Sequence, residues 1–135
     1  MGRVTRIAGW ETILAEQIEA ARLRPFQWGV HDCATWAADV RAALTGTESA
    51  AQAWRGRYKT EIGAARALRR LGWPDLATGA EAALGAPIPV LMAQRGDVVM
   101  DGQTFGVCVG ASAAFVGETG LIYARLGQCS AAWRV

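Results

Sequence analysis

The chain has 135 residues, of which 52% are hydrophobic and 19% are charged, and its formal net charge is +2. This length fits one ordinary domain, and the apolar content is sufficient for a core. The arginines are scattered rather than massed, which argues against a nucleic-acid-binding surface. We therefore expect a single domain over residues 1–135 that has no nucleic-acid partner.

The three cysteines, Cys33, Cys108 and Cys129, are odd in number and far apart, which is not the pattern of a disulfide framework. The chain has one histidine and no Cys-x-x-Cys pair, so we expect no metal site and no cofactor. Unpaired cysteines favour synthesis in a reducing compartment. No apolar run follows Arg3 and Arg6, and we expect neither a secretory signal nor a membrane span.

The first third of the chain predicts two helices. Apolar residues at three- and four-residue spacing predict an amphipathic helix from Trp10 to about Arg24, and Pro25 ends it. The same spacing predicts a second helix from Cys33 to Leu44, with Gly46 just beyond its end.

Three shorter helical segments are predicted after these. The first covers residues 50–54, and the second has Thr60 as its N-cap. The buried face of the second is expected to carry four apolar residues: Ile62, Ala65, Leu68 and Leu71. The third runs through residues 75–84, with Pro74 at a first helical position and Gly85 at its end.

The pattern changes after Pro89 to short β-branched or aromatic runs separated by glycines. These runs predict an antiparallel meander of four strands, at residues 98–100, 105–109, 113–116 and 121–124. A last strand is expected to carry Trp133. Helices followed by strands within one domain predict an α+β fold, in which N-terminal helices pack on a small C-terminal antiparallel sheet.

The stretch from residue 24 to residue 36 contains the main candidate site. Asp32 is a good N-cap, which places Cys33 at the first helical position. A thiol at a helix N-terminus lies at the positive end of the dipole, which favours the thiolate that a cysteine nucleophile needs. The same position also suits a small buried residue with no chemical role, so both interpretations stay open.

Aromatic residues around the cysteine are candidate contacts for a substrate or a partner. Phe26, Trp28 and Trp36 belong to this group, because aromatic side chains often anchor interfaces or line grooves. The alternative is that they only fix the loop or fill the core. We expect Cys108 to face the core from a strand, and Cys129 to be exposed in a polar tail.

Several motifs share their order with a known family. Trp28-Gly29 precedes Asp32-Cys33, Gly96-Asp97 opens a strand, and a Thr-Phe-Gly-Val-Cys-Val-Gly strand follows at 104–110. This order resembles the NlpC/P60 superfamily of papain-like fold, in which a His-Val-Gly-Ile-Tyr-Val-Gly-like strand takes that place. The tail is similar to a group of small proteins found in tailed phages and prophages. The resemblance covers residues 24–46 and 94–135.

The sequence departs from the family pattern at the catalytic base. By resemblance the family's histidine falls at Thr104, and threonine cannot act as a general base near neutral pH. The only histidine, His31, lies two residues before Cys33, and we expect its ring to point away from the thiol. Asp32 and Asp97 are better explained as a helix cap and a turn residue than as catalytic groups. We therefore interpret Cys33 as a vestigial nucleophile.

Two functions follow from the resemblance. The first is a structural or assembly protein of a phage tail tip, made in the bacterial cytoplasm and carried in the virion tail. Its partners would be other tail proteins, and its cysteine site would be degenerate. The alternative is an active cysteine peptidase or amidase that cleaves peptidoglycan stem peptides during phage entry. The base distinguishes them, because the enzyme needs an imidazole within hydrogen-bond reach of Cys33.

Overall fold

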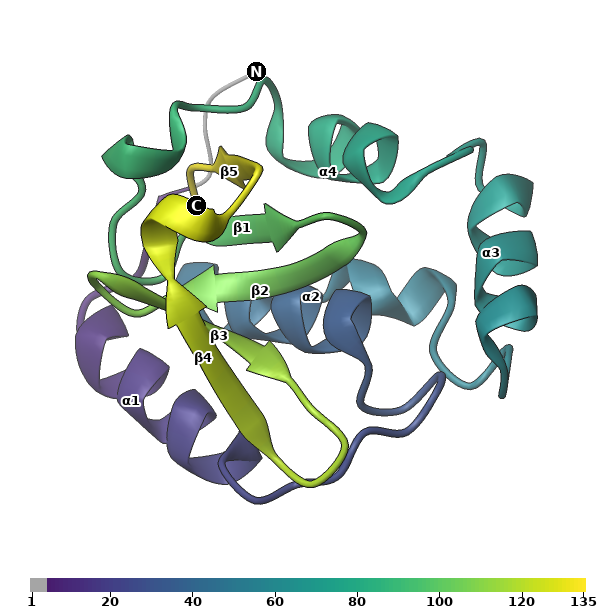
Figure 1. Ribbon diagram of the computed structural model, residues 1–135, viewed down its shortest axis with the longest axis horizontal. Helices are drawn as coiled ribbons and strands as arrows, with labels where there is room; N and C mark the ends of the chain where they lie inside the picture. Colours follow the sequence, from purple (N-terminus) through teal and green to yellow (C-terminus); the bar gives the residue numbers. More distant parts are fainter. Residues whose placement is uncertain (1–4) are drawn as a thin grey trace.

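The computed structural model describes residues 5–135, in which four α-helices precede a five-stranded antiparallel sheet (Figure 1). This arrangement confirms the predicted α+β class. The helices are α1 (Trp10–Ala21), α2 (Cys33–Thr45), α3 (Glu61–Arg70) and α4 (Leu76–Leu84). The strands are β1 (Val98–Asp101), β2 (Thr104–Cys108), β3 (Ser112–Val116), β4 (Leu121–Arg125) and β5 (Ala131–Trp133). Single 3₁₀ turns lie at Ala50–Ala53, Val90–Met92 and Leu126–Gln128.

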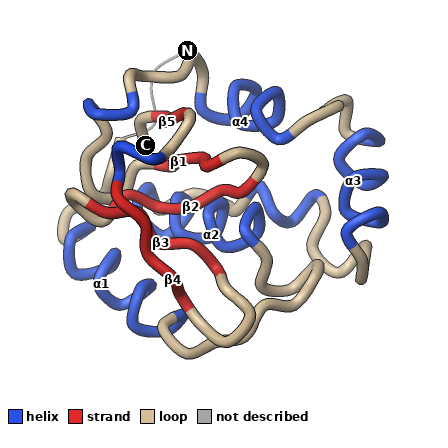
Figure 2. Tube along the Cα trace, in the orientation of Figure 1, coloured by secondary structure: helices blue, strands red, loops and turns tan. Residues whose placement is uncertain are grey.

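The strand order across the sheet is β4-β3-β2-β1-β5 (Figure 2). The first four strands form the meander that the glycine-separated runs predict, since each is antiparallel to the next. The last strand crosses to the far edge and pairs with β1, so that Trp133 lies opposite Val98. This pairing adds β5 at the edge of the sheet through residues that are more than thirty positions apart in the chain, and no local pattern predicts it.

Helices α1 and α2 pack against one face of the sheet. Val40 and Leu44 of α2 lie in one buried cluster with Leu14 of α1 and with Val107 and Ala114 of the sheet. Strand alternation sends the neighbouring side chains to the opposite face. A second cluster fills that face and holds Val99, Cys108, Ala113, Phe115, Leu126, Cys129 and Ala132.

The structure confirms that Cys108 faces the core, but the prediction of an exposed Cys129 is wrong. Cys129 is 8% exposed and lies in the same buried cluster as Cys108. The residue follows the 3₁₀ turn at Leu126–Gln128, which folds over the second face of the sheet. A sequence reading that treats this segment as a polar tail misses the turn.

The structure confirms the predicted caps of α2 and α3, but it corrects the predicted end of α1 and the predicted start of α4. Asp32 caps α2, Gly46 ends α2 with a φ of 65°, and Thr60 accepts a hydrogen bond from the Gly63 N–H at the start of α3. Helix α1 ends at Ala21 rather than near Arg24. The predicted role of Pro74 is also wrong: the N-cap of α4 is Asp75, so the proline precedes the cap.

Helix α3 stands apart from the sheet, at the right of Figure 1. Its predicted buried face is wrong, because Ile62 is 66% exposed and Leu71 is 38% exposed. The helix instead packs through Ala64, Ala67 and Leu68, in a cluster with Trp54, Tyr58 and Trp73. Helix α3 therefore covers these three aromatic rings and not the sheet. For this reason it buries a different face from the one that the apolar spacing predicts.

Asp97, which lies just before β1, joins its own turn to two distant segments, which hold Arg6 and Val135. Its buried carboxylate lies 2.8 Å from the Arg6 guanidinium and accepts hydrogen bonds from the backbone N–H groups of Gln94 and Val135. Arg6 in turn donates to the carbonyl oxygens of Arg95 and Val135. The turn residue expected from the sequence is therefore also the anchor for the segments that hold Arg6 and Val135.

Replacing Asp97 by alanine should destabilise the fold by about 3 kcal/mol, because it leaves the Arg6 guanidinium and the N–H groups of Gln94 and Val135 without their acceptor. Urea unfolding followed by tryptophan fluorescence measures the change. Asp101→Ala is the matched control, since Asp101 is exposed at the end of β1. An Asp97 variant as stable as the Asp101 variant would contradict this role of the carboxylate.

Candidate functional site

Cys33 is the first residue of α2, as the sequence predicts, and the carboxylate of Asp32 holds it there. Asp32 is 2% exposed, and its Oδ1 atom accepts a hydrogen bond of 2.9 Å from the Thr35 N–H. Its Oδ2 atom accepts from the Gly29 N–H at 2.9 Å and from the Tyr58 hydroxyl at 2.5 Å. One carboxylate therefore ties the loop before the cysteine, the helix after it and a segment 26 residues away.

The Trp-Gly motif before the cysteine is explained by close packing. Gly29 has a φ of 77°, and a Cβ atom at this position would lie 2.4 Å from the carbonyl oxygen of Tyr58. Its own carbonyl oxygen accepts a hydrogen bond from the Gly56 N–H. Only glycine fits this contact, because any side chain would push the loop away from Tyr58.

Cys33 borders a cleft of about 290 Å³ between the start of α2 and helix α3. Residues from five separate segments line it. The apolar and aromatic ones include Trp28, Ala64, Leu68, Trp73 and Pro74, and the polar ones are Asp32, Tyr58, Glu61, Asp75 and Gln103. The cysteine thus faces a mixed surface that is large enough to receive a side chain of another molecule.

Burial raises the pKa of the Cys33 thiol above its usual value, and the nearby charge of Asp32 acts in the same direction. The backbone N–H groups of Phe105, Ala34 and Cys33 itself oppose this shift. The N–H groups at the start of α2 favour the thiolate, as expected at a helix N-terminus, but desolvation of the anion is the larger effect and the pKa is raised.

His31 is buried away from the cleft. Its side chain is 2% exposed, its Nε2 atom has no hydrogen-bond partner among the described residues, and it is not among the residues that line the cysteine cleft. Burial, followed by the positive charge of Arg24, lowers the pKa of the imidazole. The main chain of His31 closes the loop by exchanging two hydrogen bonds with Gln27.

Thr104 does not take the place of a base beside the thiol. It is exposed at the start of β2, opposite Asp101 across the turn between β1 and β2. The next residue, Phe105, packs in a buried cluster with Cys33, and strand alternation directs Thr104 to the other face. The structure therefore brings neither His31 nor Thr104 to the sulfur.

The three aromatic candidates for binding have different surroundings. Trp28 lines the cleft and makes edge-to-face contacts with Phe26 and Tyr58, at ring-centroid distances of 4.7 and 6.4 Å. Phe26 is half-buried and packs against the main core cluster. The prediction of a binding role fails for Trp36, which is 4% exposed inside that cluster.

Sequence reasoning missed the Tyr58 hydroxyl, the Gln103 amide and the carboxylates of Glu61 and Asp75, all of which border the cleft. These residues come from segments that are far apart in the chain. A motif search has no signal for them, since each lies outside the 24–36 stretch. Only the packing of α3 and the turn between β1 and β2 against α2 brings them to Cys33.

The fold and the site together define an α+β domain with a partly buried cysteine at the N-terminus of a helix beside a cleft. Over residues 5–135 the chain matches the family described as a domain of unknown function, DUF6950, and it belongs to that family. Comparisons with curated proteins and with solved structures gave no match. No helix in residues 5–135 combines the length and apolar character that crossing a membrane requires. The described residues also contain no group of three potential metal ligands.

Cys33 should react with iodoacetamide more slowly at pH 7.5 than an unperturbed thiol does, because burial keeps it protonated. Peptide mapping by mass spectrometry reads each of the three cysteines separately, and free glutathione gives the reference rate. The urea-unfolded protein is the control, in which all three should react at the reference rate. Rapid alkylation of native Cys33 below pH 7 would contradict a raised pKa.

His31 should make the protein less stable in weak acid. Its folded-state pKa lies below the ordinary value of 6.5, so the unfolded chain binds the proton first as the pH falls. The stability due to the neutral ring is complete above pH 6.5 and is lost below it, by at most about 1.4 kcal/mol per pH unit. Urea unfolding at pH 7.5 and 5.5 measures the loss.

His31→Gln is the control for this pH dependence, since it keeps a polar side chain at the site but removes the titrating ring. The variant should lose less stability than the natural protein between the two pH values. Equal losses in the two proteins would assign the pH dependence to other groups.

Proposed function

We propose that this protein is a structural or assembly component of a phage tail tip, in which the cysteine site is degenerate. The observation that carries the proposal is the state of Cys33, a thiol with a raised pKa and no imidazole beside it. A cysteine peptidase needs a base within hydrogen-bond reach of the sulfur, to generate the thiolate. The phage-tail assignment itself comes from the resemblance to small proteins of tailed phages and prophages.

The contacts around Cys33 support a structural role for the whole motif. Asp32 is fully engaged in binding three donors, and Gly29 is required by its contact with Tyr58. Each motif residue thus has a packing function that needs no reaction. The same residues would be retained in a domain that has lost catalysis but keeps its shape.

Exposed apolar side chains offer surfaces for neighbouring tail proteins. Ile122 and Tyr123 on β4, an edge strand of the sheet, are 59% and 54% exposed. Leu91 and Met92, in the 3₁₀ turn before β1, are 77% and 59% exposed. Contacts at such positions would add apolar burial to an assembly without involving the cysteine cleft.

The cleft favours a second candidate, a cysteine peptidase or amidase that acts on peptidoglycan stem peptides. It borders Cys33, and Tyr58 and Gln103 are among the other residues that line it. A substrate would have to lower the thiol pKa on binding, since the free protein supplies no neighbouring cation for that purpose among the groups acting on Cys33. This requirement makes the enzyme the weaker candidate.

Cys33→Ala tests the proposal in a phage that carries this gene. Particle assembly and infectivity should stay within about twofold of the unmodified phage, because alanine keeps a small residue at the first helical position. Trp36→Ala is the contrasting variant and should reduce the yield of folded protein, since truncating a buried tryptophan costs about 3–5 kcal/mol.

Purified protein provides the second arm of this test. Incubation with peptidoglycan fragments should release no new peptide ends, as read by mass spectrometry. Cleavage that disappears in Cys33→Ala, or normal particles that lose infectivity in that variant, would replace the structural role with the enzymatic one.

A further inference from the structure

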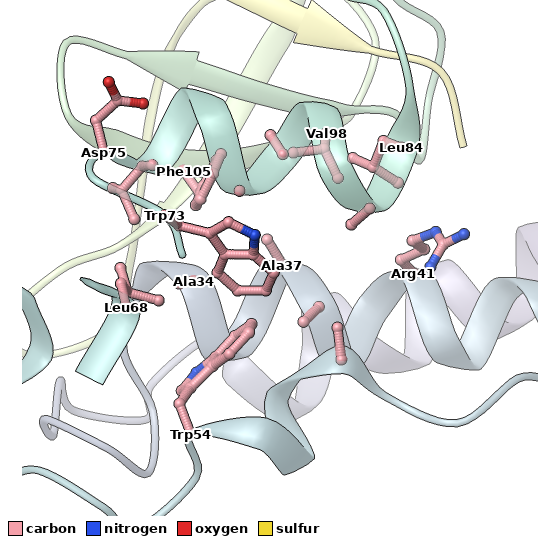
Figure 3. A pocket seen from close by; sticks show the side chains of 16 residues that line it. Ala34, Ala37, Arg41, Trp54, Leu68, Trp73, Asp75, Leu84, Val98 and Phe105 are labelled. Atoms are coloured by element: carbon pink, nitrogen blue, oxygen red, sulfur yellow. The ribbon is translucent and has the colours of Figure 1, made fainter. Parts of the chain in front are cut away.

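A second cavity, of about 70 Å³, lies next to the cysteine cleft and is almost entirely apolar (Figure 3). Its walls come from α2, from the aromatic pair Trp54 and Trp73, and from α4. The two tryptophan rings meet edge to face, with their centroids 6.0 Å apart. Cys33 is not among the residues that line this cavity, so its use does not depend on the chemistry of the thiol.

Small residues on two helices create this space. Ala34, Ala37 and Ala38 of α2 face Gly79 and Ala80 of α4 across the cavity. A Cβ atom on Gly79 would lie 3.2 Å from the Trp73 ring, so glycine allows the ring to approach α4 closely. The side chains leave an unfilled volume where cores are normally close-packed. Such a volume is available to an apolar group from another molecule.

Arg41 supplies a positive charge at one end of the cavity. It follows Ala34 by seven positions and Ala37 by four, which places all three on one face of α2. Its guanidinium has no hydrogen bond or ion pair with any residue from 5 to 135, whereas Arg55 pairs with Asp39 and Arg6 pairs with Asp97. Burial lowers the pKa of Arg41, which is the mark of a partly desolvated cation without a partner.

The opposite end carries a negative charge. Figure 3 shows the Asp75 carboxylate and the Arg41 guanidinium on either side of the tryptophan pair. Asp75 is already used as the N-cap of α4, accepting a hydrogen bond of 2.7 Å from the Thr78 N–H. An anionic group is therefore attracted to the Arg41 end and repelled from the Asp75 end, which gives a bound molecule one orientation.

We propose that this cavity binds a short aliphatic group joined to a carboxylate, with the carboxylate on Arg41 and the aliphatic part between α2, α4 and the tryptophan pair. An apolar cavity of about 150 Å³ accommodates benzene. Half that volume suits a branched chain the size of a leucine or valine side chain. Two sources share this chemistry: a free short-chain carboxylic acid, and the C-terminal residue of a peptide. The inference goes beyond the proposed tail function and does not rest on it.

Three probes test the charge and the source. Isovalerate stands for the free acid, N-acetyl-leucine for a peptide C-terminus, and N-acetyl-leucinamide for the same side chain without charge. Calorimetry and tryptophan fluorescence measure binding, because Trp54 and Trp73 line the cavity. At least one acid should bind, and N-acetyl-leucinamide at least about tenfold more weakly than that acid, since the ion pair with Arg41 is lost. The tighter of the two acids identifies the source.

Matched variants locate the site. Arg41→Gln should weaken binding of the acid by about tenfold or more, whereas Arg125→Gln, at an exposed arginine on β4, should leave it unchanged. Ala83→Phe should reduce binding of the acid and the amide alike, because residue 83 is an exposed part of the cavity wall.

The proposal is overturned if neither acid binds, if acid and amide bind equally, or if Arg41→Gln binds as the natural protein does. Circular dichroism shows whether each variant is folded. Should Arg41→Gln fail to fold, the comparison of acid with amide on the natural protein, together with Ala83→Phe, still decides the outcome. Loss of Cys33 should change none of these affinities, which separates this test from that of the proposed function.

Discussion

The buried carboxylate of Asp32 is the interaction on which the organisation of this domain depends. It accepts hydrogen bonds from the start of α2, from the loop at Gly29 and from the Tyr58 hydroxyl. Burial together with this bond raises the pKa of Tyr58, so that its hydroxyl stays protonated as a donor. Because a buried carboxylate without donors would be costly, the three segments are coupled to one another. The cysteine cleft forms where they meet.

The same burial that orders this site also reduces its reactivity. Cys33 has the position of a nucleophile, but burial among aromatic and apolar groups raises the pKa of its thiol, despite the backbone N–H groups that favour the thiolate. His31 is buried too, and burial keeps its ring neutral without bringing it to the cleft. Position at a helix end is thus insufficient for activation when no cation or base shares the pocket.

Helix α2 lines both the cysteine cleft and the apolar cavity, which differ in polarity. Its first turn borders the polar cleft through Cys33, and the alanines further along border the apolar cavity that ends at Arg41. Five residues line both: Ala34, Leu68, Trp73, Asp75 and Leu76. Trp73 therefore separates a surface suited to peptide contacts from a pocket suited to an aliphatic group. A ligand that moved the Trp73 ring would change the shape of both the cleft and the cavity.

Local sequence signals determined the elements that depend on local physics. The caps at Asp32 and Thr60, the α2 span and the glycine-separated meander all follow from hydrogen bonds and periodicity within a few residues. The tertiary structure alone decided the partner of β5, the burial of Cys129, the face that α3 buries and the place of Thr104 relative to the thiol. Each of these depends on contacts between distant segments. The raised pKa of the Cys33 thiol depends on them too, because burial is a property of the packed chain and not of any short stretch.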